Sequence, residues 1–248
     1  MIAGIRNGLV VGFVAGVLAG CAAHAPAPDF HALVASPDRG EADRVNDVRR
    51  KPVPFLAFMD VRPGMTVADL DAGAGYTTEL LARAVGGTGK VYAQNTPETV
   101  ERLKGRFEER MKTPAMKNVV HVMRPLDDPL PPDARNLDLA TFNFGYHDTT
   151  YQAVDREKMN RAIYNALKAG GFYVVADHSA RPGAGLSVGK SLHRIDEAVV
   201  LREVEAAGFK LVAEGGFLRN PADPRDAAVF KPNQPNDEFV LKFVKPQH

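Results

Sequence analysis

Short apolar runs alternate with amphipathic stretches along most of the chain. Apolar runs that end at turn-forming residues indicate buried strands, whereas apolar residues three or four positions apart indicate helices. The pattern predicts strands at residues 65–70, 90–93, 119–122, 137–142, 172–176, 210–213 and 239–244. It predicts helices at residues 55–59, 78–85, 97–111, 155–167 and 191–207. Gly170 and Gly171 are expected to end the helix at 155–167.

The order of these elements predicts the fold class. Strands that alternate with helices form a parallel, doubly wound sheet with helices on both faces. A chain of 248 residues has room for one well-buried domain of this kind. We therefore expect a single α/β domain that binds its ligand outside the carboxyl ends of the strands.

The N-terminus has the layout of a signal peptide. Residues 1–20 carry an early cation, Arg6, and an apolar run at 8–18 that is too short to span a membrane. The tetrad at 18–21 resembles the bacterial lipobox, in which cleavage precedes a diacylated cysteine, here Cys21. This resemblance implies a lipid anchor on the periplasmic side of the cell envelope, and Ala22 favours the outer membrane. The alternative is an ordinary secretory signal that ends by chance at a cysteine.

Composition limits the other possibilities. Residues 21–41 are rich in Ala and Pro and are expected to form a flexible tether, which leaves 42–248 as the domain. Cys21 is the only cysteine, so the sequence excludes disulfides and thiolate metal clusters. Lys and Arg number 31 against 30 Asp and Glu, and this net charge of +1 argues against nucleic acid as a partner.

A glycine turn follows the first strand of the predicted sheet. Gly73 and Gly75 would let the backbone approach a ligand closely, although such a turn alone is weak evidence. The segment 67–76 resembles motif I of class I S-adenosylmethionine-dependent methyltransferases, with Asp71 in place of the usual first glycine. The segment that runs from residues 50–52 to the region of 220–223 resembles the exported lipoprotein group of predicted methyltransferases. The resemblance implies a Rossmann-like, seven-stranded sheet, mostly parallel with one antiparallel strand near the C-terminus, and S-adenosylmethionine as the cofactor.

The resemblance also implies which residues contact the cofactor. Asp69 and the two glycines would line its methionine end and ribose. The second strand lacks the usual terminal acid, so Asn95 is expected to bind the ribose hydroxyls. An acid after the third strand would bind the adenine amino group, unless both candidates are turn residues. The expected cofactor-binding residues are Asp69, Asp71, Gly73, Gly75, Tyr76, Asn95, Asp127, Asp128 and Asn143.

Candidate catalytic residues follow the fourth and fifth strands. His147, Asp148 and His178 are expected to converge, because these strands are neighbours in the resembled topology. Either histidine is a candidate base and Asp148 would orient an imidazole. The alternatives are a helix cap and a loop contact, or a metal site built from the same three residues. His193 and His121 are expected to be structural.

Two functions remain in competition. The first is methyl transfer from S-adenosylmethionine to a small-molecule acceptor, aromatic or quinone-like by resemblance to quinone-biosynthesis methyltransferases. The second is a non-catalytic ligand-binding or interaction module, since an exported enzyme needs a supply of a cofactor made in the cytosol. A nicotinamide oxidoreductase is disfavoured because the third glycine of its fingerprint would fall at Thr78.

Overall fold

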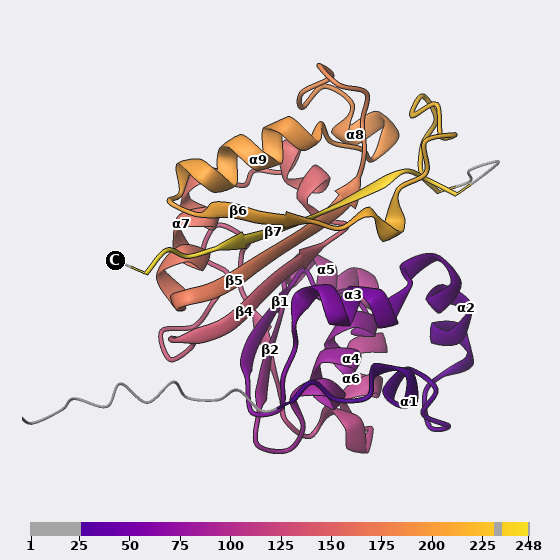
Figure 1. The fold of residues 1–248 in the computed structure, drawn as a ribbon, viewed down its shortest axis with the longest axis vertical. Coiled ribbons are helices and arrows are strands. Elements are labelled where there is room, and N and C mark those ends of the chain that lie inside the picture. The colour runs from indigo at the N-terminus through magenta and orange to yellow at the C-terminus, as the bar shows by residue number, and fades with distance from the viewer. Residues whose placement is uncertain (1–25, 231–234, 248) are drawn as a thin grey trace, which may run out of the picture.

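The strands form one continuous sheet in the computed structural model, which describes residues 26–230 and 235–247 (Figure 1). The sheet has seven strands in the order β3-β2-β1-β4-β5-β7-β6. Only β7 runs antiparallel to its neighbours, β5 and β6. The predicted fold class is confirmed. The strands are β1 (Thr66–Leu70), β2 (Lys90–Asn95), β3 (Val119–Met123), β4 (Leu137–Asn143), β5 (Leu167–His178), β6 (Lys210–Glu214) and β7 (Glu238–Val244).

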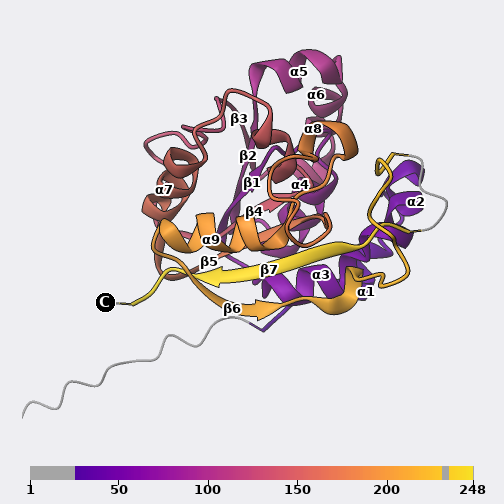
Figure 2. The same ribbon diagram turned by 90° about the horizontal axis from the view of Figure 1, so that it is seen from above.

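Helices cover both faces of the sheet and bury an apolar core on each (Figure 2). One core lies beneath α1, α3, α4, α5 and α6, and the other lies beneath α7 and α9. The helices are α1 (Phe30–Val34), α2 (Glu41–Arg50), α3 (Pro52–Met59), α4 (Tyr76–Val85), α5 (Pro97–Leu103), α6 (Arg106–Met111), α7 (Arg156–Ala166), α8 (Gly189–Leu192) and α9 (Glu197–Ala206). Burial of these apolar side chains on both faces is the main stabilising contribution.

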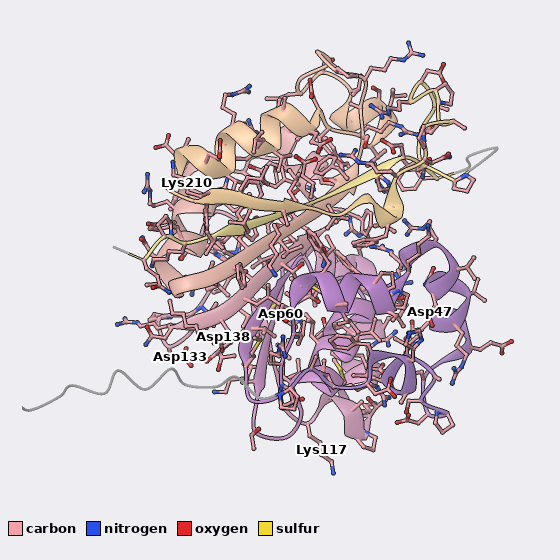
Figure 3. The ribbon with its side chains drawn as sticks, in the orientation of Figure 1. Asp47, Asp60, Lys117, Asp133, Asp138 and Lys210 are labelled. Atoms are coloured by element: carbon pink, nitrogen blue, oxygen red, sulfur yellow. The ribbon has the colours of Figure 1, made fainter. Side chains whose placement is uncertain are left out.

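The folded structure begins earlier than the sequence indicates. Phe30 on α1 is buried against the core that α3 and α4 cover, and Arg39 is buried in an ion pair with Asp47. Asp47, labelled in Figure 3, lies on α2. Residues 30–39 are therefore packed chain rather than tether. The predicted signal peptide and Cys21 lie outside the described residues, and none of the described helices is long and apolar enough to cross a membrane.

The helix predicted at 191–207 is wrong as a continuous element. His193 adopts a left-handed conformation (φ 53°) that ends α8, and the Asp196 side chain caps α9 by accepting a hydrogen bond from Ala198 N. Between them, Ile195 forms an isolated parallel β-bridge with Ser179, the residue that follows β5. The predicted helix at 97–111 is likewise divided at Lys104, which is left-handed.

The expected glycine stop also differs from the structure. Helix α7 ends at Ala166, and β5 begins at Leu167, so Gly170 and Gly171 lie within the strand. There they accompany a register shift between β4 and β5. Glycines in a strand commonly mark such irregularities.

Candidate functional site

Two cavities open at the carboxyl edge of the sheet, where β1, β4 and β5 end. The smaller, of about 210 Å³, lies against the turn between β1 and α4. The larger, of about 690 Å³, lies between α2 and the segments that follow β4 and β5. Arg50 and Phe144 line both cavities and thus form the boundary between them.

The glycine turn has an unusual backbone that two buried amide side chains support. Asp71, Gly73 and Gly75 all have positive φ, and an aspartate tolerates this region better than most residues. The Oε1 atom of Gln94 accepts a hydrogen bond from Asp71 N at 2.9 Å. Asn95 accepts one from Gly73 N at 2.8 Å and donates one to Gly73 O at 3.2 Å. Asn95 is fully buried by these contacts and lines neither cavity, so it supports the turn rather than facing a ribose.

Opposite charges line the smaller cavity. Burial raises the pKa of the Asp69 carboxyl to about 7, although the Thr78 hydroxyl donates to it at 2.6 Å and opposes that rise. Burial lowers the pKa of Arg50 to about 10, which leaves it cationic at neutral pH. The Arg50 guanidinium lies 3.9 Å from the centre of the Phe144 ring and makes no hydrogen bond to another described residue. A zwitterionic ligand would complement this pair of charges.

Two further observations show that the smaller cavity fits the amino-acid end of S-adenosylmethionine. The Nδ2 atom of Asn143 is buried and has no hydrogen-bond partner among the described residues, although this amide lines the cavity. A Cβ atom added to Gly73 would meet nothing within 4 Å, so the turn leaves open space there. An unpaired buried donor is costly unless a ligand satisfies it.

Three other expected cofactor residues already have protein partners. The Tyr76 hydroxyl donates to Asp47 Oδ1 at 2.6 Å, while its ring lines the smaller cavity. Asp127 pairs with Lys158 at 3.2 Å, and Asp128 pairs with Arg124. Neither aspartate lines either cavity, so their assignment to adenine stays a prediction.

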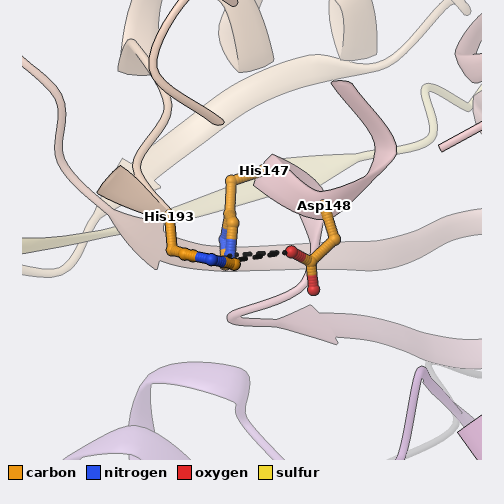
Figure 4. A group of neighbouring side chains, drawn as sticks. All are labelled: His147, Asp148 and His193. Atoms are coloured by element: carbon orange, nitrogen blue, oxygen red, sulfur yellow. Dashed lines mark hydrogen bonds and ion pairs between the residues drawn. The ribbon is translucent and has the colours of Figure 1, made fainter. Parts of the chain in front are cut away.

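The larger cavity contains the candidate catalytic residues, which the structure does bring together. The rings of His147 and His178 have centroids 5.8 Å apart, and His147 Nε2 lies 3.1 Å from Asp148 Oδ1. His193 joins them, with its Nδ1 atom 3.3 Å from His147 Nε2 (Figure 4). Asp177, which is fully buried, lies 2.7 Å from His147 Nδ1 on the other side of the ring.

Charge fixes the state of His147. Burial alone would lower its pKa, but Asp177 and then Asp148 outweigh that effect and raise the pKa to about 10. Burial likewise would raise the pKa of Asp148, but the hydrogen bond and charge of His147, together with the Tyr151 hydroxyl, outweigh burial and lower the pKa to about 2. His147 is therefore protonated at neutral pH when no other cation is present, which argues against its service as a free base in that state.

Sequence reasoning missed three residues of the site. Asp177, not Asp148, orients the His147 ring, and Gln94 supports the glycine turn. His193, expected to be structural, lies at the cluster. Asp177 had a signal in the sequence, since it ends the strand beside the one that precedes His147. The position of His193 depends on the break between α8 and α9, and no pattern in the sequence indicated that break.

The strand order, the glycine turn and the charged cavity together define a class I S-adenosylmethionine-dependent methyltransferase fold. Residues 49–191, more than half of the chain, match the ubiE/COQ5 methyltransferase family. The chain belongs to this family, and that membership implies S-adenosylmethionine as its cofactor.

Curated relatives match only part of their length. The chain is 33% identical over 119 residues to the ubiquinone/menaquinone biosynthesis C-methyltransferase UbiE of Escherichia coli K12. The UbiE protein of Shigella boydii serotype 18 gives the same identity. The match covers 48% of this chain and 45% of each relative, so the chain spans about half the length of the relatives it matches.

Solved structures show the same fold at low sequence identity. A S-adenosylmethionine-dependent methyltransferase from Aquifex aeolicus has a TM-score of 0.56 at 16% identity, covering 84% of this chain and 100% of that chain. A putative methyltransferase from Haloferax volcanii, in complex with the Trm112 activator, has a TM-score of 0.58 at 20% identity, covering 84% and 94%.

Alanine substitutions of the two glycines separate cofactor contact from backbone support. Gly73→Ala adds a methyl group to open space in the cavity and should raise the dissociation constant for S-adenosylmethionine at least about tenfold, with about 1 kcal/mol of backbone strain. Gly75→Ala places Cβ 2.8 Å from Arg110 Cδ and should instead lower the unfolding free energy by about 2 kcal/mol or more. Urea unfolding and calorimetric titration measure the two effects. Equal losses in both assays for both variants would contradict this division.

Cofactor affinity should depend on the ionisation of Asp69. The ammonium group of S-adenosylmethionine favours a carboxylate, whereas Asp69 with a pKa of about 7 is largely protonated at pH 6. Below pH 7, binding must release that proton, so affinity should rise about tenfold per pH unit toward pH 7 and then level off. Calorimetric titrations between pH 5.5 and 7.5 check this, with Asp69→Asn as the variant that loses the slope. A flat profile for the wild type would rule it out.

Proposed function

We propose that this chain transfers a methyl group from S-adenosylmethionine to a small-molecule acceptor. The observation that carries the proposal is the junction of the two cavities at Arg50 and Phe144. One cavity complements the amino-acid end of the cofactor, and the other offers a separate space for an acceptor. Family membership supports the same reaction class.

The residues of the smaller cavity would hold the cofactor, which supplies a methyl group on a positively charged sulfur. Arg50 would bind the carboxylate, Asp69 the ammonium group, and Asn143 would donate its free amide hydrogen to the same end. Asp71 would offer carboxylate oxygens to the ribose hydroxyls in place of the acid that β2 lacks. These contacts fix the cofactor and so reduce the entropic cost of bringing two reactants together.

The walls of the larger cavity suit an aromatic acceptor with an acidic hydroxyl group. Phe144, Tyr151 and Phe230 supply aromatic surface, while Arg49 and Arg102 supply positive charge. The proton that the acceptor loses would leave on the side of the histidine cluster, the polar wall of this cavity. The UbiE relatives are named for C-methylation in quinone biosynthesis, which favours a phenolic or quinol-like acceptor here.

Substitution of Arg50 tests the cofactor site. Arg50→Met removes the cation that would pair with the carboxylate but keeps the packing against Phe144. It should raise the dissociation constant for S-adenosylmethionine about tenfold to a hundredfold, which corresponds to one charge-assisted hydrogen-bonded contact. Arg106→Met is the matched control, because Arg106 is exposed and lines neither cavity. Calorimetric titration reads out both variants.

A transfer assay tests the reaction itself. Wild-type protein with methyl-labelled S-adenosylmethionine should label a phenol or quinol from a panel, and Arg50→Met should lose that labelling at low cofactor concentration. Saturable cofactor binding without transfer to any member would instead favour a non-catalytic binding module. One observation favours this second function. Gln94 and Asn95, at the end of β2, bond the backbone of the glycine turn, so neither is free to bind a ribose. Absence of cofactor binding would overturn the enzymatic proposal.

We also propose that the chain is a lipoprotein anchored in the bacterial cell envelope through Cys21, with the domain on the periplasmic side. The lipobox-like tetrad at 18–21 supports this location. Cys21→Ser should leave an uncleaved precursor without lipid, because the acylated thiol is required before cleavage. Labelled palmitate in a Gram-negative host measures the modification, and Ala23→Ser is the control that keeps it. Normal labelling of the Cys21→Ser variant would eliminate the anchor.

A further inference from the structure

Three side chains at the inner wall of the larger cavity direct one ligand-type atom each toward a common point (Figure 4). His147 Nε2 lies 3.1 Å from Asp148 Oδ1 and 3.3 Å from His193 Nδ1. His193 Nδ1 lies 3.4 Å from Asp148 Oδ1. Two imidazole nitrogens and a carboxylate oxygen thus form a nearly equilateral triangle.

The size of this triangle matches a bound metal ion. Donor atoms about 2.1 Å from a common ion are separated by about 3.0 Å at octahedral angles and about 3.4 Å at tetrahedral angles. The three observed separations, 3.1, 3.3 and 3.4 Å, fall within that interval or at its limit. An ion would lie slightly to one side of the triangle, with its remaining positions free.

The surroundings of the triangle are those of a prepared metal site. Asp177 is fully buried and lies 2.7 Å from His147 Nδ1, which leaves Nε2 of the same ring as the ligand atom. Carboxylates that orient a metal-binding imidazole in this way are usual around zinc. Asp177 is itself fixed, because it accepts hydrogen bonds from His147 N and His178 N, each at 2.7 Å.

The third ligand is also held from behind. Arg194, the residue after His193, is buried and pairs with Asp223 at 2.8 Å while donating to Ser179 O at 3.0 Å. His193 packs on Phe230 with ring centroids 4.5 Å apart. The buried Arg194 and the contact with Phe230 therefore hold His193 where its Nδ1 atom faces His147 and Asp148.

We propose that His147, Asp148 and His193 bind one divalent transition-metal ion whose open positions face the larger cavity. Two nitrogen ligands and one carboxylate suit Zn²⁺, Fe²⁺ or Co²⁺ rather than Mg²⁺ or Ca²⁺, which prefer oxygen ligands alone. The bound ion replaces the proton on His147 Nε2 that is present when no ion is bound.

The role of the ion rests on the proposed methyl transfer, whereas its binding does not. An oxygen of the acceptor would occupy an open position, and the ion would lower the pKa of that hydroxyl group. Its O–H bond then breaks with loss of the proton to water, and the electron pair remains on the acceptor as the nucleophile. The site accordingly selects acceptors that carry a metal-binding hydroxyl group.

Metal titration of the purified, chelator-treated protein tests the site directly. Calorimetry with Zn²⁺ and absorption spectroscopy with Co²⁺ should show one equivalent bound, with visible bands typical of mixed nitrogen and oxygen ligands. Asp148→Asn and His193→Asn should each weaken binding at least about thirtyfold. Asparagine suits position 193, since it tolerates the left-handed conformation of His193. Asp177→Asn should weaken binding about tenfold to a hundredfold through ring orientation.

Two histidine variants serve as controls. His31 is exposed on α1, so His31→Ala removes an imidazole far from the proposed ligands in the sequence. His178→Ala removes the nearby imidazole that is not part of the triangle. Both should keep the single equivalent and its affinity. Failure of the wild-type protein to bind either ion, or unchanged binding in Asp148→Asn and His193→Asn, would overturn the site.

A parallel titration with S-adenosylmethionine separates this inference from the proposed function. Metal binding with loss in the two ligand variants supports the site even if no cofactor binds. Cofactor binding and methyl transfer that proceed unchanged in chelator-treated protein would leave the reaction standing and remove the ion from it.

Discussion

The buried carboxylate of Asp177 makes the interactions on which the arrangement of the larger cavity depends. It accepts hydrogen bonds from two backbone amides and lies against the Nδ1 atom of His147, so it joins the end of β5 to the segment after β4. A carboxylate without exposure to water is stable only when its oxygens are satisfied in this way. The neighbouring strands, which are parallel, bring the two segments close, and Asp177 then determines which nitrogen of His147 faces the cavity.

The cofactor side is organised by a different constraint, the backbone of the glycine turn. Three of its residues have positive φ angles, and the side chains of Gln94 and Asn95 accept hydrogen bonds from the backbone amides of Asp71 and Gly73. These two amide residues stand at the end of β2, where the resembled family has an acid that faces the ribose. Asp71, within the turn, restores a carboxylate nearby. Gln94 and Asn95 thus support the turn, and under the proposed function the ribose would be bound by Asp71 instead.

The sequence was informative wherever local pattern decides structure. The seven strands and most helices follow from apolar runs and turn residues, and the polar residues after β4 and β5 indicated a site. The failures share one cause, since long-range contacts override local pattern there. Ile195 and Val199 fit one helical face, yet the buried Arg194–Asp223 pair and the Asp196 cap divide that helix and turn His193 toward the cavity. Residues 30–39 have a loop-like composition, but Phe30 and Arg39 find partners in the domain.

The part of the chain that matches the family contains all of the smaller cavity but only part of the larger one. Every residue that lines the smaller cavity falls within 49–191, the part of the chain that matches the ubiE/COQ5 family. The larger cavity draws His193, Val229, Phe230 and Asn236 from beyond that part. Family membership therefore accounts for the cofactor but not for the acceptor. His193, whose Nδ1 atom is one of the three that converge in the proposed metal site, also lies beyond the matched part.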